Sequence, residues 1–124
     1  MTVIATSYSS DPNQTDDTPC LPAMWKYDLC EQFLKHGEEN TIAANFLPLG
    51  TQVRFPEMYG NKIFTVRDRM NSRYNYDRLG YYRIDFYKAE LGDNGDIDVK
   101  ASKQEARQFG IKRGLKMEIL AYVK

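Results

Sequence analysis

Hydrophobic and polar residues alternate along several short stretches of this chain, which is the pattern of half-buried β-strands. The stretches are rich in β-branched and aromatic residues and are bounded by Gly, Pro, Asn, Asp or Ser. They predict strands over residues 2–8, 41–44, 51–55, 62–66, 81–87 and 115–123. In the segment 81–87 the two-residue period places Arg83, Asp85 and Tyr87 on one face.

Two further segments have helical patterns. Asp28 is a suitable N-cap for a short helix that ends at Gly37. Ser102 and Glu105 form a capping-box pair that opens a second short helix. Six short strands without a covering layer of helices must protect their edges, which a sheet does by closing on itself. We therefore expect a mainly β fold, a small barrel with two short helices, in a single domain over residues 1–124.

The composition is that of a globular domain. Of the 124 residues, 42% are hydrophobic and 27% are charged, and no apolar run approaches the roughly 18 residues that a membrane-spanning helix needs. The formal net charge is zero, so the chain lacks the positive charge typical of nucleic-acid-binding domains. His36 is the only histidine, and the two cysteines do not have metal-ligand spacing. We expect a monomer with no cofactor, no membrane span and no nucleic-acid partner.

The two cysteines leave alternatives open. Cys20 and Cys30 are close enough in sequence to form a disulfide that closes a small loop, or they remain free thiols. A disulfide would indicate an oxidising compartment and would stabilise the fold by about 2–3 kcal/mol. Residues 1–6 are too short and too uncharged for a secretory signal. Either the protein stays inside the cell, or its signal is not part of this sequence.

Three aspartates are the candidate catalytic groups. Asp16, Asp68 and Asp85 each lie where a predicted strand ends or turns. A carboxyl group in apolar surroundings has a raised pKa, as a general acid near neutral pH requires. Asp85, between Ile84 and Phe86, fits this description best. The alternative is structural, since carboxylates at strand ends often bind loop N–H groups or arginines.

A basic, tyrosine-rich segment surrounds two of these aspartates. Between residues 61 and 88, lysines and arginines outnumber acidic residues, and five tyrosines are interspersed. Aromatic rings can stack on sugar faces, and arginines can bind carboxylates. The candidate substrate-binding residues in this segment are Arg69, Asn71, Tyr74 and Arg83.

Six sequence blocks, in this order, resemble a known family. The blocks are residues 5–10 (ATSYSS), 14–16 (QTD), 42–51 (IAANFLPLGT), 64–71 (FTVRDRMN), 83–85 (RID) and 105–110 (EARQFG). Each block alone is weak evidence, but together they extend over nearly the whole chain. On these blocks the sequence resembles the three-aspartate domain family, which is similar to the double-psi β-barrel catalytic domain of membrane-bound lytic transglycosylase A.

The resemblance implies a six-stranded double-psi β-barrel with two short helices that acts on bacterial peptidoglycan. The implied activity is non-hydrolytic cleavage of MurNAc-GlcNAc glycan strands, with one aspartate as general acid and then general base. Asp16, Asp68 and Asp85 match the three family aspartates, and Asp85 matches the position of the catalytic acid. The implied partner is the peptidoglycan glycan strand, and the implied location is extracellular or in the cell envelope.

The chain departs from such enzymes after Asp68. The enzymes have a glycine-rich turn there, whereas this chain continues with residues 69–78 (RMNSRYNYDR). Two hypotheses therefore remain open: a lytic transglycosylase, and a catalytically inactive module that binds cell-wall glycans through its arginines and tyrosines. A third, single-stranded nucleic-acid binding by the arginines and tyrosines of residues 67–83, conflicts with the zero net charge.

Overall fold

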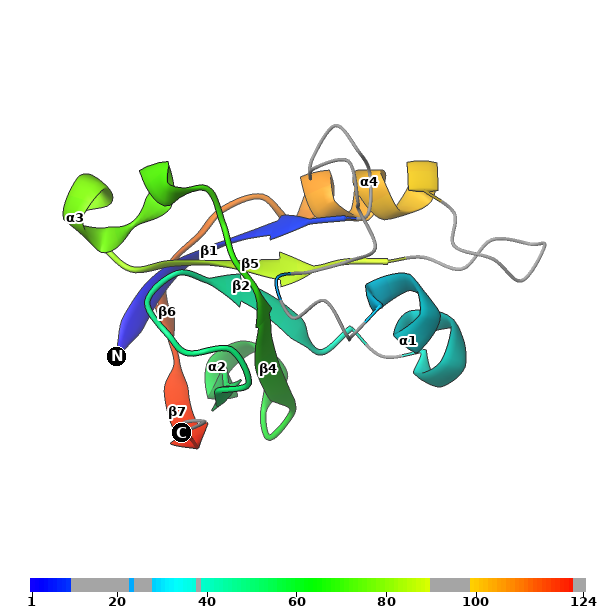
Figure 1. Ribbon diagram of the computed structural model, residues 1–124, viewed down its shortest axis with the longest axis horizontal. Coiled ribbons are helices and arrows are strands. Elements are labelled where there is room, and N and C mark those ends of the chain that lie inside the picture. Colours follow the sequence, from blue (N-terminus) through cyan, green and yellow to red (C-terminus); the bar gives the residue numbers. More distant parts are fainter. Residues whose placement is uncertain (10–22, 24–27, 38, 90–98, 122–124) are drawn as a thin grey trace.

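The computed structural model describes residues 1–9, 23, 28–37, 39–89 and 99–121. In this part of the chain seven strands form one mixed sheet, in the order β6-β1-β5-β2-β4-β3-β7 (Figure 1). The strands are β1 (Thr2–Tyr8), β2 (Thr41–Ala44), β3 (Gln52–Arg54), β4 (Ile63–Asp68), β5 (Arg83–Tyr87), β6 (Lys112–Lys116) and β7 (Glu118–Ala121). The helices are α1 (Leu29–His36), α2 (Pro56–Tyr59), α3 (Tyr76–Leu79) and α4 (Val99–Phe109), with one 3-10 turn, η1 (Ser72–Tyr74). The protein is therefore mainly β with a few short helices, as the sequence predicts.

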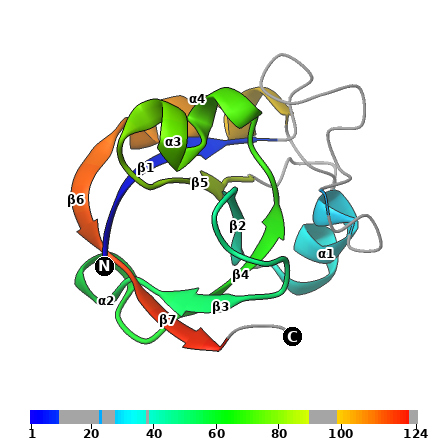
Figure 2. The same ribbon diagram turned by 60° about the vertical axis from the view of Figure 1, so that its left-hand side comes forward.

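The sheet combines parallel and antiparallel pairs. β1 is parallel to β5 and antiparallel to β6, and β2 is parallel to β4 and antiparallel to β5. β3 is antiparallel to both β4 and β7. Figure 2 shows that the sheet is strongly curled. Its edge strands, β6 and β7, are separated only by Met117, so one stretch of chain supplies both edges.

One face of the sheet carries the main hydrophobic core. Phe55, Phe64 and Phe86 are almost completely buried there, and their rings make edge-to-face contacts with centroids 4.8 to 5.4 Å apart. The other buried members of this core are Val3, Ala5, Ile42, Ala44, Leu47, Val53, Val66, Ile84, Leu115 and Met117. Alternate strand residues supply most of them, as the two-residue period requires.

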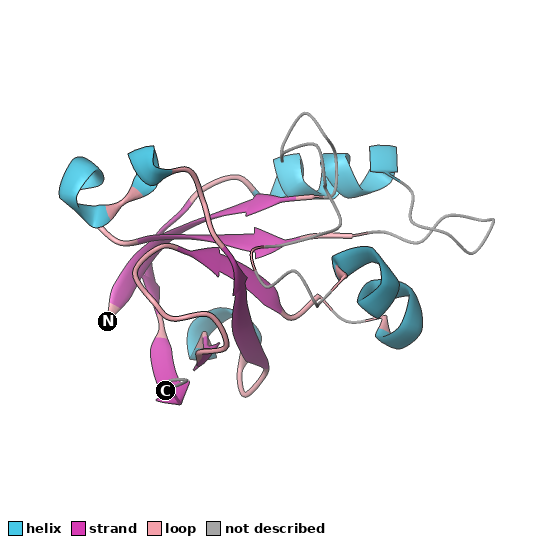
Figure 3. Ribbon diagram, in the orientation of Figure 1, coloured by secondary structure: helices cyan, strands magenta, loops and turns pink. Residues whose placement is uncertain are grey.

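The opposite face of β1, β2 and β5 carries a second, smaller hydrophobic cluster. Tyr8, Ala43 and Tyr87 project from these strands, and Leu29 and Phe33 of α1 belong to the same cluster. α1 therefore covers part of this face. Figure 3 shows the helices at the periphery of the strands.

α1 forms as the sequence predicts. The Asp28 carboxylate accepts a hydrogen bond from the N–H of Glu31 at 2.9 Å and so caps the first turn. Gly37 ends the helix with a φ of 67°, a left-handed conformation that glycine adopts without a steric penalty.

The predicted capping box of α4 is wrong. The helix begins at Val99, so Ser102 lies inside it instead of at its N-cap. Ser102 and Ala106 are one turn apart on the same helix face, and both are buried. Ser7 of β1 donates a hydrogen bond to the Ala106 carbonyl at 2.5 Å. Residues 99–101 are already helical, so Ser102 is an interior position on the buried side of α4 and not its N-cap.

The segment predicted as the last strand forms two strands in the structure. The segment expected over residues 115–123 begins at Lys112 and breaks at Met117. β6 pairs with β1 whereas β7 pairs with β3, so the chain must change its partner there. The side chain of Met117 is buried in the core, and its N–H donates to the Met1 carbonyl at 2.9 Å. The described chain consequently has seven strands instead of the six expected.

The structure contains three short helical segments, α2, η1 and α3, in addition to the two helices that the sequence predicts. Each has only three or four residues, which is too few to show a 3.6-residue hydrophobic period. Pro56 begins α2, where a missing N–H has no cost. No helix in the described part of the chain has the length and hydropathy needed to cross a membrane.

Substitution of Phe86 by alanine is expected to destabilise the fold by about 3–5 kcal/mol, because a cavity would remain in the aromatic core. Phe86 is 1% exposed. Its ring partners are Phe55, Tyr59, Phe64 and Phe109. Urea unfolding measures the change. The control is Ile111→Ala, at a residue that is 58% exposed, with an expected change within about 0.5 kcal/mol. Equal effects of the two substitutions would contradict this core.

Candidate functional site

A β-bulge in β4 decides the direction of Asp68. Val66 points into the main core, so a regular strand would direct Asp68, two residues later, into the core as well. The pairing of β2 with β4 shifts from Ile42↔Val66 to Ala43↔Asp68, which leaves Arg67 as an extra residue. Asp68 thereby shares the face of Ala43, outside the main core.

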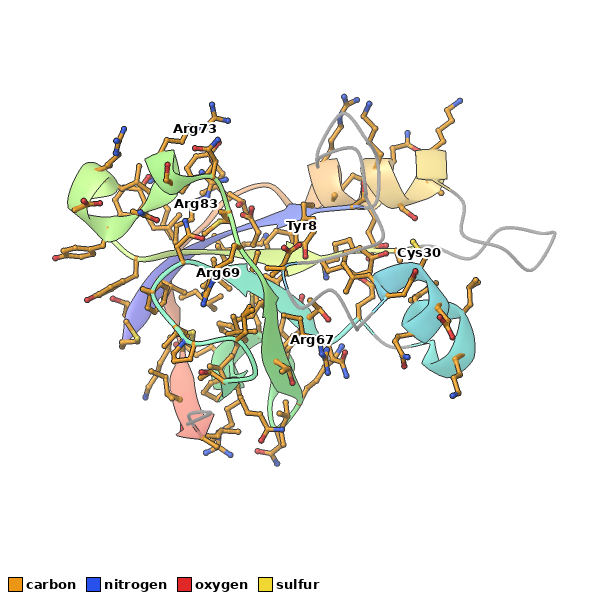
Figure 4. The ribbon with its side chains drawn as sticks, viewed as in Figure 1. Tyr8, Cys30, Arg67, Arg69, Arg73 and Arg83 are labelled. Atoms are coloured by element: carbon orange, nitrogen blue, oxygen red, sulfur yellow. The ribbon has the colours of Figure 1, made fainter. Side chains whose placement is uncertain are left out.

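The two aspartates lie in one row across the sheet. Ala43 of β2 is paired with Asp68 of β4 on one side and with Asp85 of β5 on the other, and Asp85 is paired with Thr6 of β1. Residues in register on neighbouring strands project from the same face. Asp68 and Asp85 therefore share this face with Thr6 and with Tyr8, two residues further along β1. Figure 4 shows Tyr8 and Arg83 in this part of the molecule.

Thr6 and Arg83 hold the Asp85 carboxylate. The Thr6 hydroxyl donates a hydrogen bond to Asp85 Oδ1 and accepts one from Arg83 Nη2 at 2.9 Å. Arg83 Nη2 also lies 3.6 Å from the same Asp85 oxygen, within ion-pair range. The side chain of Asp85 is 14% exposed, so it is mostly buried without being sealed from solvent.

The pKa of Asp85 is raised above its usual range. Burial is the largest cause, because it disfavours the charged form, and the negative charge of Asp68 acts in the same direction. The charge and hydrogen bond of Arg83 oppose these effects and limit the increase of the pKa. Asp85 thus keeps its proton to higher pH than an exposed aspartate, while the guanidinium stabilises the carboxylate after the proton has left.

Asp68 accepts hydrogen bonds from a tyrosine hydroxyl and from two backbone N–H groups of the described residues. Its Oδ2 binds the Tyr8 hydroxyl at 3.0 Å, and its Oδ1 binds the backbone N–H groups of Ala23 at 3.0 Å and Arg69 at 2.8 Å. Tyr8 is buried, and burial together with the charges of Asp68 and Asp85 raises the pKa of its hydroxyl well above the usual range. The Tyr8 hydroxyl therefore stays protonated and remains a donor to Asp68.

Arg83 connects the aspartates to an aromatic segment. Its guanidinium lies 4.0 Å from the centroid of the Tyr74 ring in η1, a cation–π contact. Arg73 contacts the same ring at 4.9 Å. Tyr76, at the start of α3, is 50% exposed, and its ring centroid lies 4.4 Å from that of Tyr82. Aromatic side chains therefore border the site on the side of Arg83.

Asn45, which no pattern in the sequence singles out as a site residue, anchors the segment that follows Asp68. Its Nδ2 donates to the Asn71 carbonyl at 3.2 Å and to Asn75 Oδ1 at 2.7 Å. Its Oδ1 accepts from the N–H of Met70 at 2.8 Å. The partners are 25 to 30 residues away in sequence, so no local motif could have indicated this role.

Two predicted substrate-binding residues make contacts within the protein. Arg69 Nη1 donates to the carbonyls of Ala44 and Leu47 and so supports the loop after β2. Asn71 Oδ1 accepts from the N–H of Arg73 at 3.0 Å and caps η1. These contacts give Arg69 and Asn71 structural roles, and substrate binding by either residue stays a prediction.

The structure brings four of the predicted site residues into one region: Asp68, Asp85, Tyr74 and Arg83. The third family aspartate, Asp16, lies outside the described residues. In the described part of the chain, no three His, Cys, Asp or Glu side chains are grouped so that they could hold a metal ion. The arrangement consists of one buried carboxyl that can give and take a proton and a second carboxylate that influences it.

Cys30, in α1, takes part in a disulfide. This decides between the two alternatives that the sequence leaves open. The predicted partner, Cys20, lies outside the described residues.

No protein-family model, curated protein or solved structure matches this chain. Membership of the three-aspartate family therefore stays a prediction from the sequence blocks.

Two substitutions are expected to move the pKa of Asp85 in opposite directions. Asp68→Asn removes a neighbouring negative charge and should lower it, whereas Arg83→Gln removes the positive charge that favours the carboxylate and should raise it. NMR titration of the Asp85 side-chain carboxyl carbon measures both shifts. The control is Asp77→Asn, at an exposed residue of α3, which should leave the Asp85 pKa unchanged. Shifts of the same sign for the first two variants would contradict the site.

Proposed function

We propose that this domain is a peptidoglycan lytic transglycosylase-like enzyme that cleaves MurNAc-GlcNAc glycan strands, with Asp85 as both acid and base. The observation that carries the proposal is the environment of Asp85: a mostly buried carboxyl with a raised pKa, held by Thr6 and Arg83. One carboxyl is sufficient because the substrate supplies the nucleophile, unlike in glycosidases that need two.

The proposed fold is the double-psi β-barrel that the sequence resemblance implies. Two features support it. The sheet mixes parallel pairs, β1 with β5 and β2 with β4, with antiparallel ones. Its two edge strands are joined at Met117, an arrangement suited to closing the sheet and removing exposed edges.

The proposed location is the cell envelope or the extracellular space. The disulfide at Cys30 supports it, because such bonds persist in oxidising compartments.

The proposed reaction has two proton transfers. Asp85 first donates its proton to the glycosidic oxygen while the bond from that oxygen to C1 of MurNAc breaks. The Asp85 carboxylate then takes the proton of the MurNAc 6-hydroxyl, whose oxygen bonds to C1 and closes a 1,6-anhydro ring. No water is consumed. Between the two steps, the guanidinium of Arg83 at 3.6 Å stabilises the carboxylate.

Asp68 acts as a positioning residue in this scheme. Its charge raises the pKa of Asp85 and favours the acid form that the first step needs. The hydrogen bonds from Tyr8 and two backbone N–H groups fix its own orientation. Tyr74, stacked on Arg83, provides an aromatic surface beside the site on which a sugar ring could pack.

A catalytically inactive glycan-binding module is the second candidate. The segment after Asp68, where the resembling enzymes have a glycine-rich turn, forms the helical turns η1 and α3 here. Arg83 also forms an ion pair with the Asp85 carboxylate. Both observations favour a site that binds a glycan without cleaving it.

Asp85→Asn is expected to abolish the release of anhydro-muropeptides from isolated peptidoglycan sacculi, with a loss of about 100-fold or more, because the amide cannot transfer the proton. Mass spectrometry of the soluble products measures this. Asp77→Asn, at an exposed carboxylate of α3, is the matched control and should retain full activity.

Other outcomes of this experiment separate the alternatives. Reducing-end products would indicate a hydrolase. Binding of the parent to sacculi without any products would establish the inactive module, and neither binding nor products would reject both candidates. Equal activity of the parent and a folded Asp85→Asn variant would exclude Asp85 as the catalytic residue.

The rate of cleavage is expected to fall as pH rises through the raised pKa of Asp85, because the first step needs the protonated form. In the Asp68→Asn variant this alkaline limb should move to lower pH, since the Asp85 pKa falls. The measurement is kcat/KM against pH for both proteins on a soluble glycan strand. If the alkaline limb of the pH profile were the same in the variant and the parent, Asp68 would not be a positioning residue for Asp85.

A further inference from the structure

Three aromatic rings are stacked at the start of β5, beside the segment that follows Asp68. The Tyr76 ring of α3 lies with its centroid 4.4 Å from that of Tyr82, and the two ring planes are inclined by 32°. The Tyr82 ring in turn contacts that of Phe46, with centroids 4.6 Å apart and an angle of 43°. Phe46 and Tyr82 pack against the main core, so the stack runs from the core to the surface at Tyr76. Figure 1 shows α3 beside the start of β5.

The outermost ring of the stack, Tyr76, is open to solvent on one side. The residue is 50% exposed. Tyr82 covers one face of its ring, and no other ring or cation of the described residues is stacked on it. The exposed half therefore includes the face that points away from Tyr82. An aromatic face that is backed by a second ring and open to water can pack against the apolar face of a ligand.

The fold holds the Tyr76 ring in place before any ligand binds. Asn75, the residue before Tyr76, accepts a hydrogen bond from Asn45 Nδ2 at 2.7 Å. The loop that carries Phe46 is held by the guanidinium of Arg69, through two of the backbone carbonyls of that loop. A side chain that is already ordered loses less conformational freedom on binding than a mobile one.

The stack adjoins the candidate site without being part of it. Tyr76 follows Tyr74 by two residues, so their Cα atoms are at most about 7 Å apart, and the Tyr74 ring lies on the guanidinium of Arg83. Tyr82 directly precedes Arg83, but consecutive residues of an extended chain point to opposite faces. A ligand at Asp85 therefore reaches Tyr76 only if it extends past Arg83, as a chain of linked sugars does.

The surroundings of Tyr76 favour an uncharged ligand. Its neighbours in α3, Asp77 and Arg78, are both exposed and have opposite charges. An aromatic groove for single-stranded nucleic acid needs an excess of positive charge along its length. A pyranose ring, in contrast, is uncharged and has an apolar face. The balance of charge in α3 thus favours a sugar over a nucleotide base.

We infer that Tyr76, supported by Tyr82 and Phe46, is a second sugar-binding position for the glycan strand. One pyranose ring packs on the outer face of Tyr76 while another part of the same strand lies at Asp85. The inference rests on the proposed function for the identity of its ligand. It requires binding alone, so it applies to the enzyme and to the inactive module alike.

The test measures the affinity for soluble peptidoglycan glycan strands by isothermal titration calorimetry, in the full chain with Asp85→Asn so that cleavage does not consume the ligand. In this background Tyr76→Ala should weaken binding about tenfold, because the ring contact is lost. Tyr76→Phe keeps the ring and should bind within about twofold of the background protein. Since Tyr76 is half exposed, these substitutions leave the core intact.

The matched control is Leu120→Ala in β7, at an apolar residue of similar exposure, 42%, outside the stack. Its affinity should stay within about twofold of the background protein. Equal affinity of the background protein and Tyr76→Ala would overturn the inference. A loss in Tyr76→Phe or Leu120→Ala as large as that in Tyr76→Ala would also overturn it, as would the absence of any binding by the background protein.

Cleavage of sacculi by the parent, measured separately, distinguishes this inference from the proposed function. Release of anhydro-muropeptides by the parent, together with binding that Tyr76→Ala leaves unchanged, would overturn the inference and support the enzyme. Binding that depends on Tyr76, without release of products, would support the inference and reject the enzyme.

Discussion

The β-bulge in β4, where its register with β2 shifts, is the constraint on which the candidate site depends. Because a strand has a period of two, one extra residue moves the side chains that follow to the other face of the sheet. The extra residue turns Asp68 away from the core and into the row of Asp85. The extra residue itself, Arg67, lines a separate polar cleft. The bulge in β4 thus places Asp68 beside Asp85 and leaves Arg67 at the separate cleft.

Burial on both sides of the sheet makes hydrogen bonding of the aspartates necessary. The main core lies on one face, and the cluster of α1 with Tyr8 and Tyr87 covers part of the other. Polar groups that are buried between two hydrophobic layers are stable only when they have hydrogen-bond partners. Asp68 binds the Tyr8 hydroxyl and two backbone N–H groups, and Asp85 binds the Thr6 hydroxyl and the Arg83 guanidinium. The properties of Asp85 follow from this balance, since desolvation raises its pKa and Arg83 limits the increase.

The position of Arg83 depends in turn on the segment that follows Asp68. Tyr74 of η1 stacks on the guanidinium, and Asn45 ties this segment to the loop after β2. The electrostatics of Asp85 are therefore coupled to contacts made by residues far from it in sequence. The same segment is where the chain departs from the glycine-rich turn of the enzymes that it resembles, so its conformation bears on both candidate functions.

The sequence by itself determined the features that depend on neighbours along the chain. Alternation located the strands closely, the cap at Asp28 and Gly37 located α1, and apolar neighbours singled out Asp85. Tertiary structure decided what depends on distant partners: the break at Met117, the bulge in β4 and the anchor at Asn45. Local pattern predicts which residues alternate, but only the pairing of strands sets their register, and register decides which charges share a face.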